Sequence, residues 1–310
     1  MSRFRLSDVL SIDSRFGRSV NLERDFYSDL TIDSYVVTST TIRSLARGVD
    51  AIKARGSNRA WTLTGPYGSG KSTFGLFLGK VFDVRATSDT TKARELLKTS
   101  GKEIWFDLFS KPKSNVELFS ILVSGASEPV AEAVLRGIRI ALERSGYPGL
   151  EGVKRKVTRL SGKGNAGGRD LIEIIDAISK VVRKKNPLAG VLLIIDELGK
   201  LLEYAANSGK RADIYVLQEL AEAANDQNRQ FFLITALHQA FDQYARRLKR
   251  EDREEWMKIQ GRFEDLAFQE PNEQILHILR HIYSDRSGLG AHELMEIIGT
   301  RLSERAYRLE

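Results

Sequence analysis

The segment that most constrains the fold is a glycine-rich run of eight residues, GPYGSGKS at 65–72. It matches the pattern G-x-x-x-x-G-K-[ST] at every fixed position, and in this pattern the glycines let the backbone curl so that its N–H groups surround a phosphate chain. Such a loop needs a strand before it and a helix after it. Both are present, since WTLT precedes the run and TFGLFLGKV follows it. The run predicts a phosphate-binding turn within an α/β domain.

The residues of this loop have separate expected roles. Lys71 is expected to reach the β- and γ-phosphates, and the Ser72 hydroxyl to coordinate Mg²⁺. The dipole of the helix that starts near Lys71 attracts the same anion. ATP with Mg²⁺ is the expected ligand, because the guanine-recognising sequence N-K-x-D is absent. The residues predicted to contact the nucleotide are Gly65, Pro66, Tyr67, Gly68, Ser69, Gly70, Lys71, Ser72 and Thr73.

A pair of carboxylates follows a second strong strand signal. Five apolar residues at 191–195 lead directly into Asp196 and Glu197. A continuous apolar run predicts a strand that is covered on both faces of a parallel sheet, and such sheets bind ligands at the carboxyl ends of their strands. We expect Asp196 to hold Mg²⁺ and Glu197 to act as general base on the attacking water. The pair favours hydrolysis over phosphoryl transfer to a small molecule.

Polar residues also follow the next apolar strand, expected at 231–236. Thr235, His238 and Gln239 are candidates to contact the terminal phosphate or the water. Arg262 precedes a short strand expected at 266–268, and it is a candidate arginine finger, which stabilises transition-state charge in a neighbouring subunit. Capping, core or surface roles are open alternatives for each of them.

Hydrophobic spacing predicts the remaining elements. Helices are expected over 41–54, 72–81, 116–142, 169–184, 213–224, 273–283 and 292–305. Strands are expected over 60–64, 104–108, 191–195, 231–236 and 266–268. This alternation predicts a doubly wound α/β domain, with a central parallel sheet and helices on both faces. The expected organisation is an N-terminal segment at 1–34, a nucleotide-binding domain at 35–271, and a helical lid or the start of a C-terminal domain at 272–310.

The net charge of +7 is concentrated in one stretch. Residues 136–185 contain thirteen Lys or Arg against five Asp or Glu, so the stretch carries +8 and the rest of the chain −1. An insertion is expected at about 136–168, and its glycine-rich part, 146–168, predicts a flexible basic loop. The stretch is either a solvated insertion or a surface for nucleic acid or another polyanion. Tyr147 is its one aromatic residue, so phosphate contact is expected rather than base stacking.

Composition excludes several classes of protein. Hydrophobic residues make up 42% of the 310 residues and cysteine is absent, which excludes a disordered chain, a disulfide scaffold and thiolate metal sites. The longest apolar run, 191–195, is too short to cross a bilayer. The polar N-terminus does not read as a signal peptide. We therefore expect a cytoplasmic location and no membrane partner.

The order of these motifs resembles that of the AAA+ ATPases: a phosphate loop, an Asp-Glu strand, a sensor strand, then R-F-x-x-x-x-F at 262–268 and a proline before a helix. The resemblance covers roughly residues 35–285. It implies a sheet in strand order 5-1-4-3-2, a small helical lid, and work as a homo-oligomer or a multi-subunit assembly. It places Thr235 or His238 near the sensor position and Arg262 near the finger. The 125 residues between Lys71 and Asp196 are a long separation, and the usual sensor asparagine is absent.

The phrases LTGPYGSGKSTF and IIDELGKLLEYAA are similar to the large ATPases of bacterial anti-phage systems, such as the BREX ATPase. This narrower resemblance implies antiviral defence or DNA transactions, in which ATP hydrolysis drives conformational change or assembly. Three alternatives stay open: a nucleotide-dependent switch or scaffold with little turnover, a DNA-binding module regulated by ATP, and an ABC-type ATPase. The last is suggested by GSGKST, by His238 and by a partial signature, LSGKG at 160–164.

Overall fold

The computed structural model describes residues 10–12, 19–28, 32, 35–53, 58–110, 115–162, 166–208, 211–245, 250–271, 274–275, 278 and 283–285. The chain divides into two compact units, one formed by residues 1–19 with 271–310 and the other by residues 20–270. In the first unit, β1 (Leu10–Ile12) pairs antiparallel with β7 (Tyr283–Asp285). The predicted helix at 292–305 lies outside the described residues, as does most of that at 273–283.

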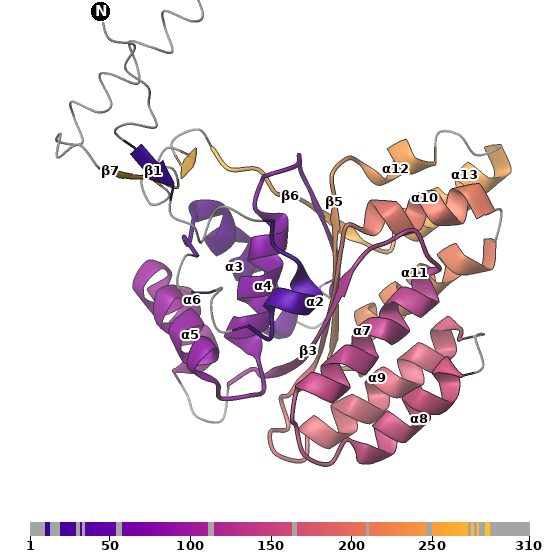
Figure 1. Ribbon diagram of the computed structural model, residues 1–310, viewed down its shortest axis with the longest axis horizontal. Helices are drawn as coiled ribbons and strands as arrows, with labels where there is room; N and C mark the ends of the chain where they lie inside the picture. Colours follow the sequence, from indigo (N-terminus) through magenta and orange to yellow (C-terminus); the bar gives the residue numbers. More distant parts are fainter. Residues whose placement is uncertain are drawn as a thin grey trace, which may run out of the picture. The chain divides into compact units, whose positions relative to one another are not determined.

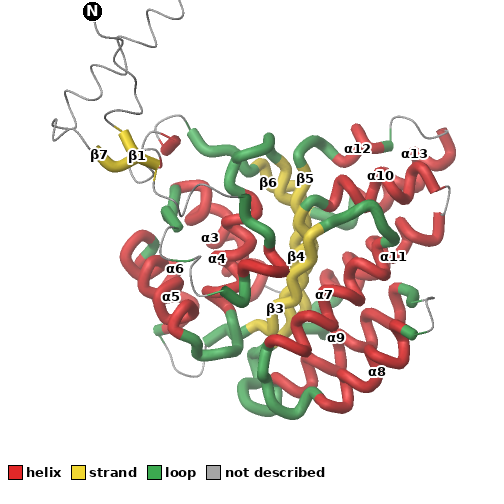
Figure 2. Tube along the Cα trace, in the orientation of Figure 1, coloured by secondary structure: helices red, strands yellow, loops and turns green. Residues whose placement is uncertain are grey.

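A five-stranded parallel sheet forms the centre of the unit at 20–270 (Figure 2). Its strands are β2 (Ala60–Thr64), β3 (Leu118–Ser124), β4 (Gly190–Asp196), β5 (Phe231–Leu237) and β6 (Glu264–Ala267). They lie in the order β3-β4-β5-β2-β6. Counted along the chain and read from β6, this is the order 5-1-4-3-2, so the predicted fold class is confirmed.

Helices cover both faces of the sheet (Figure 1). On one face lie α2 (Leu22–Asp25), α3 (Ser39–Lys53), α4 (Lys71–Phe82), α5 (Ser88–Ser100) and α6 (Lys102–Phe109). On the other lie α7 (Val130–Arg144), α8 (Glu151–Ser161), α9 (Gly168–Val182), α10 (Leu198–Ser208), α11 (Arg211–Asn225), α12 (Phe241–Tyr244) and α13 (Arg250–Gln260). Each face has its own apolar core. Strand β4 supplies both, with Leu193 in one core and Ile194 in the other, because successive side chains of a strand point to opposite faces.

Two predicted elements are wrong, and both lie between the phosphate loop and the acidic pair. The expected strand at 104–108 is helix α6, in which Ile104 and Leu108 are buried one turn apart while Phe106 is exposed. The second strand of the sheet is instead β3, which had been placed in a helix over 116–142. Its run LFSILVS is buried almost throughout, and a short apolar run has no periodicity that separates a buried strand from a buried helix.

Much of the glycine-rich stretch 146–168, predicted as a flexible loop, is helical, and residues 163–165 lie outside the described residues. The stretch contains helix α8, whose Val153 and Val157 are buried one turn apart in the core that α7 and α9 also enter. The four-residue spacing of these two valines indicates a helix, because it places both side chains on the same side of one. No helix in the described part of the chain is long and apolar enough to cross a membrane.

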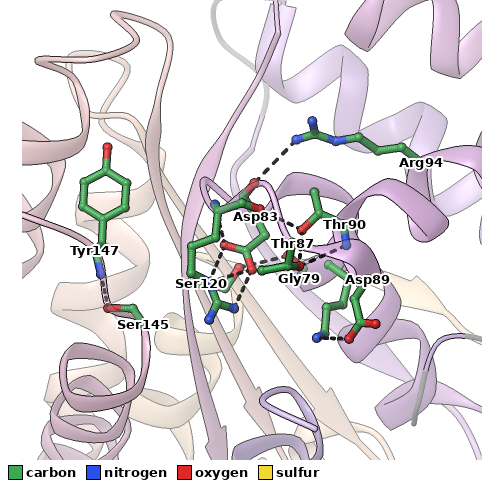
Figure 3. A network of polar contacts seen from close by, with 11 residues as sticks. Gly79, Asp83, Thr87, Asp89, Thr90, Arg94, Ser120, Ser145 and Tyr147 are labelled. Carbon is green, nitrogen blue, oxygen red and sulfur yellow. Dashed lines mark hydrogen bonds and ion pairs between the residues drawn. The ribbon is translucent and has the colours of Figure 1, made fainter. Parts of the chain in front are cut away.

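A network of buried polar groups lies at the end of α4 (Figure 3). The Lys80 ammonium lies 2.5 Å from Asp89 Oδ2 on α5, and both side chains are almost completely buried. Arg85 binds the buried Asp83 carboxylate with its guanidinium. From β3, the Ser120 hydroxyl donates to the carbonyl of Gly79 at 3.2 Å. The network joins the helix of the phosphate loop to α5 and to β3.

Candidate nucleotide-binding site

The predicted phosphate loop connects β2 to α4 at the carboxyl edge of the sheet. Gly68 and Gly70 have positive φ angles of 77° and 89°, which are accessible to glycine without strain. Gly70 precedes the first residue of α4 and has no side chain to cap the helix. The first-turn N–H groups of α4 are therefore available to an anion, and the helix dipole favours one there.

Lys71 lies inside this loop and is almost completely buried. Its ammonium donates to the carbonyl oxygens of Gly65 at 2.7 Å and Pro66 at 2.8 Å, and to Ser69 Oγ at 3.1 Å. Burial lowers the pKa of Lys71, and the nearby Asp196 carboxylate partly opposes this effect. The three loop acceptors are neutral, so a phosphate would provide the anionic partner that a desolvated ammonium lacks.

Ser72 and Asp196 meet across the edge of the sheet. Asp196 ends β4 and is 4% exposed. Burial raises the pKa of its carboxyl group, while hydrogen bonds from the Ser72 hydroxyl and the Glu197 N–H lower it. The Glu197 N–H donates to Asp196 Oδ1 at 2.9 Å. The adjacent hydroxyl and carboxylate fit Mg²⁺, which binds proteins through one or two carboxylates and completes its octahedron with water and phosphate oxygens. Among the described residues, no group of three or more His, Cys, Asp or Glu is arranged to hold a metal ion by itself.

The backbone of Glu197 is held in an uncommon conformation. Its φ angle of 51° is the one positive value at a non-glycine residue in the described chain, and such residues concentrate at functional sites. Gly125, which follows β3, packs against it so closely that a Cβ there would lie 2.4 Å from the Glu197 carbonyl oxygen. Glu197 Oε2 is ion-paired with the Lys200 ammonium at 2.5 Å. Sequence reasoning missed both neighbours, because a glycine after a strand and a lysine on a helix are ordinary features.

The two predicted sensor residues lie in different surroundings. Thr235 is fully buried, and its hydroxyl hydrogen-bonds Thr62 Oγ1 at 3.1 Å and the Trp61 carbonyl at 3.2 Å, within the sheet. His238 follows β5 and lies beside the phosphate loop. The exposed ring of Tyr67 stacks on the imidazole, with 3.4 Å between the ring centroids.

His238 is the sensor candidate that shares the electrostatic environment of the site. Burial lowers the pKa of its imidazole, the Lys71 ammonium lowers it further, and Asp196 and Glu197 oppose this change. Neither ring nitrogen has a hydrogen-bond partner among the described residues. These effects favour the neutral imidazole, which has one donor and one acceptor nitrogen.

Arg262 lies at the opposite edge of the sheet. Strands β2 and β6 are parallel, so Arg262, which precedes β6, is at the amino edge, while the phosphate loop is at the carboxyl edge. Its Nε donates to Glu222 Oε1 on α11 at 3.0 Å. Hydrogen bonds from Gln218 and Arg262 lower the pKa of Glu222. The predicted finger is thus remote from the phosphate loop of its own chain.

Arg136, the first residue of the basic stretch, belongs to the carboxyl edge of the sheet. Its guanidinium donates to the Ser124 carbonyl at 3.1 Å and to Glu128 at 2.6 Å, and it is ion-paired with Glu23 of α2. Ser124 lies opposite Asp196 in the β3–β4 register. This charge therefore supports the strand beside the acidic pair and is not free for a partner.

No family model matches the chain. No curated protein matches it in sequence. Two solved structures are similar in fold. The ORC2 protein of Aeropyrum pernix, solved as ADPNP-ADP complexes, is 15% identical with a TM-score of 0.48, and the match covers 89% of this chain and 60% of that one. PCH-2 of C. elegans is 15% identical with a TM-score of 0.32, and the match covers 77% and 47%. This chain thus spans less than two thirds of either protein.

The fold is established by the chain's own geometry. A parallel sheet in the order 5-1-4-3-2 carries a glycine-rich phosphate loop after its first strand and an acidic pair after its third. The chain therefore has an α/β fold with a parallel sheet and helices on both faces, and the phosphate-loop sequence lies at the carboxyl edge of this sheet.

Proposed function

We propose that this chain binds ATP with Mg²⁺ and hydrolyses the nucleotide to ADP and phosphate, in the manner of an AAA+ ATPase. One observation carries the proposal. Lys71 with Ser72 from the loop after β2, Asp196 with Glu197 from the end of β4, and His238 from the end of β5 meet at one edge of the sheet. An ammonium, two magnesium ligands, a base and a neutral imidazole are the groups that hydrolysis of a bound nucleotide requires.

Each group has a role in that reaction. Lys71 and the N–H groups of the loop hold the phosphates, and Ser72 with Asp196 holds the metal. Mg²⁺, when bound, neutralises charge on the phosphate oxygens. Glu197 accepts a proton as the water oxygen attacks the γ-phosphorus and the bond to the bridging oxygen breaks. Neutral His238 is placed to donate a hydrogen bond to a γ-phosphate oxygen or to the attacking water.

A nucleotide-dependent switch with little turnover is the second candidate. The ion pair between Glu197 and Lys200 favours it, because the lysine occupies a carboxylate oxygen that would otherwise contact the attacking water. Arg262, at the opposite edge, is placed to serve a second copy or a partner rather than its own site. We therefore propose slow turnover by the isolated chain and faster turnover in an assembly, with anti-phage defence or DNA transactions as the setting that the sequence resemblance suggests.

The ABC-type alternative receives less support from the position of its partial signature. Leu160 and Ser161 lie at the C-terminal end of α8. A helix C-terminus carries negative partial charge and does not attract phosphate. We therefore do not adopt that alternative.

Equilibrium binding of a labelled ATP analogue and steady-state phosphate release test the proposal together. We expect Lys71→Ala to abolish binding. We expect Glu197→Gln to retain binding and lower turnover by about 10²- to 10⁴-fold, the usual contribution of a general base. Glu203→Gln, on the exposed side of α10, is the matched control and should leave both nucleotide binding and turnover unchanged. Turnover undiminished by either site variant would contradict hydrolysis at this site. Retained nucleotide with negligible wild-type turnover would select the switch.

A further inference from the structure

Helix α8 packs on α7 and α9, which themselves contact the sheet, so α8 is the outermost helix on this face (Figure 1). Together with the end of α9, it carries much of the basic stretch. Helices α8 and α9 run antiparallel. The Lys156 ammonium of α8 pairs with Glu173 of α9 at 2.6 Å, and Gly149, just before α8, packs against Val181 near the end of α9. The start of α8 therefore adjoins the end of α9. Because Val153 and Val157 anchor α8 in the core, the charges on its outer side are held on a rigid element.

The acidic side chains of α9 are occupied. Glu173 pairs with Lys156, and Asp176 pairs with Arg229 at 3.3 Å. Asp170 accepts the Gly167 N–H at the start of the helix. None of these three carboxylates is paired with Arg155, Arg159 or the lysines at the end of α9.

Six exposed cations of α8 and the end of α9 have no acidic partner among the described residues, and one of them, Arg183, donates to the Pro187 carbonyl instead. Arg155 and Arg159 are one turn apart on the solvent side of α8, and three lysines lie on or just after the last turn of α9, beside the start of α8. We call these five the basic face: Arg155, Arg159, Lys180, Lys184 and Lys185. It concentrates positive charge on one side of the molecule, which is how an electrostatic binding surface differs from evenly distributed charge.

We propose that the basic face binds the phosphate backbone of double-stranded DNA. A duplex presents a dense row of phosphates, and cations that replace its counterions gain affinity without any contact to bases. The face offers no aromatic side chain on which unpaired bases would stack, so single strands lack their usual contacts. Leu188 is the one exposed large hydrophobic side chain near it within the described chain, which is too little for insertion into a lipid surface. This activity is additional to the nucleotide site and does not require it.

Fluorescence anisotropy with the intact chain and a labelled duplex of about 25 base pairs tests this inference at about 50 to 200 mM salt. We expect log Kd to rise linearly with log salt, with about 0.9 units of slope for each phosphate neutralised. Arg155→Glu with Arg159→Glu should weaken binding by about tenfold or more and make the slope shallower. Lys71→Ala should bind the duplex as the wild type does, which separates this result from the outcome at the nucleotide site.

Lys98→Glu with Lys102→Glu is the matched control. It changes the net charge by the same amount on α5 and α6, which cover the opposite face of the sheet, and both lysines are exposed. We expect an effect below about twofold. Arg155→Gln with Arg159→Gln supplies a milder variant if charge reversal impairs folding. Equal loss in the α8 and control variants would overturn the proposal, since only net charge would then matter. Tighter binding of a single strand would also overturn it, and so would binding of poly-glutamate without binding of the duplex, which would reassign the face to an acidic protein.

Discussion

The two faces of the sheet differ in how many charged side chains they bury. On the side of α4, Lys80, Asp83 and Asp89 are buried together between helices and strand β3. On the other side, every buried residue of α7, α8 and α9 is apolar or glycine, and the cations of α8 and α9 lie toward solvent, while Arg136 of α7 is held by Glu23 and Glu128. One face therefore buries a cluster of charged side chains within its apolar core, whereas on the other the helices α7, α8 and α9 bury apolar side chains and the buried Asp213 of α11 accepts from the Val130 N–H.

This difference follows the position of the proposed nucleotide site. Lys71 and Asp196 are also buried, and both belong to the face that α4 covers. A buried charge costs free energy unless a partner compensates it, whereas buried apolar area contributes stability with no such requirement. The structure thus places two further buried charges where the proposed phosphate and metal would bind, on the same face as Lys80, Asp83 and Asp89.

The largest effect should come from separating the buried pair. Lys80→Met should destabilise the fold by about 3 to 5 kcal/mol, because it leaves Asp89 as an uncompensated buried charge. The side chains of Lys80 and Asp89 are only 5% and 3% exposed, so water cannot solvate the Asp89 carboxylate once the lysine is removed. Urea unfolding should show a lower midpoint at an unchanged slope.

The double variant Lys80→Met with Asp89→Leu distinguishes a charge effect from a packing effect. Replacing both ions of a buried pair by apolar groups is often nearly neutral, so most of the lost stability should return. A double variant as unstable as Lys80→Met would show that shape, not charge, dominates at this position. That result would remove the contrast between the two faces.

Substitution of Asp196 should have a smaller effect on the stability of the fold, and it should stabilise rather than destabilise it. Because burial raises its pKa in the folded state above the ordinary 3.8, the ionised carboxylate destabilises the fold at neutral pH. The penalty is present above the folded pKa and disappears below about 3.8, where the group is protonated in both states. Asp196→Asn should therefore raise the Tm of the nucleotide-free chain at pH 8, with a gain that shrinks as the pH falls.

Thermal unfolding over a pH series checks this prediction, with Asp50→Asn on the exposed side of α3 as the control. Metal-dependent nucleotide binding should fall in Asp196→Asn while stability rises, as expected where a site is built at the expense of the fold. A gain that is constant with pH would mean that the ionised carboxylate is not what destabilises this edge.

The sequence predicted the central strands and the motifs of the site because these features are local. The apolar run before Asp196 and the glycines before Lys71 each identify one element without information from elsewhere. The prediction failed between these two motifs, because it placed a strand where α6 lies and a helix where β3 lies. Ile104 and Leu108 are four residues apart, as expected for one side of a helix. A run of buried residues such as β3 can be assigned as a strand only from its neighbours in the sheet.

The parts of the site that sequence reasoning missed depend on tertiary contact. Gly125 matters because β3 ends against the Glu197 carbonyl, and Lys200 matters because the helix after the acidic pair turns it back toward that carboxylate. Neither contact follows from a motif. The basic loop was mispredicted for a related reason, since the glycines around α8 concealed the spacing of two buried valines.

The smallest effect should come from the ion pair that joins α8 to α9. Lys156→Ala should change the free energy of unfolding by no more than about 1 kcal/mol, because an exposed pair gains little beyond what water provides. The side chains of Lys156 and Glu173 are 44% and 67% exposed, against 5% and 3% for the buried pair, although the two ion pairs have nearly equal lengths of 2.6 and 2.5 Å. Urea unfolding at low and high salt measures this change in the free energy of unfolding, and high salt should reduce it further. A loss above about 2 kcal/mol would mean that charge supports the apolar face as well. A loss within the expected range would leave burial, rather than distance, as the property that separates the two faces.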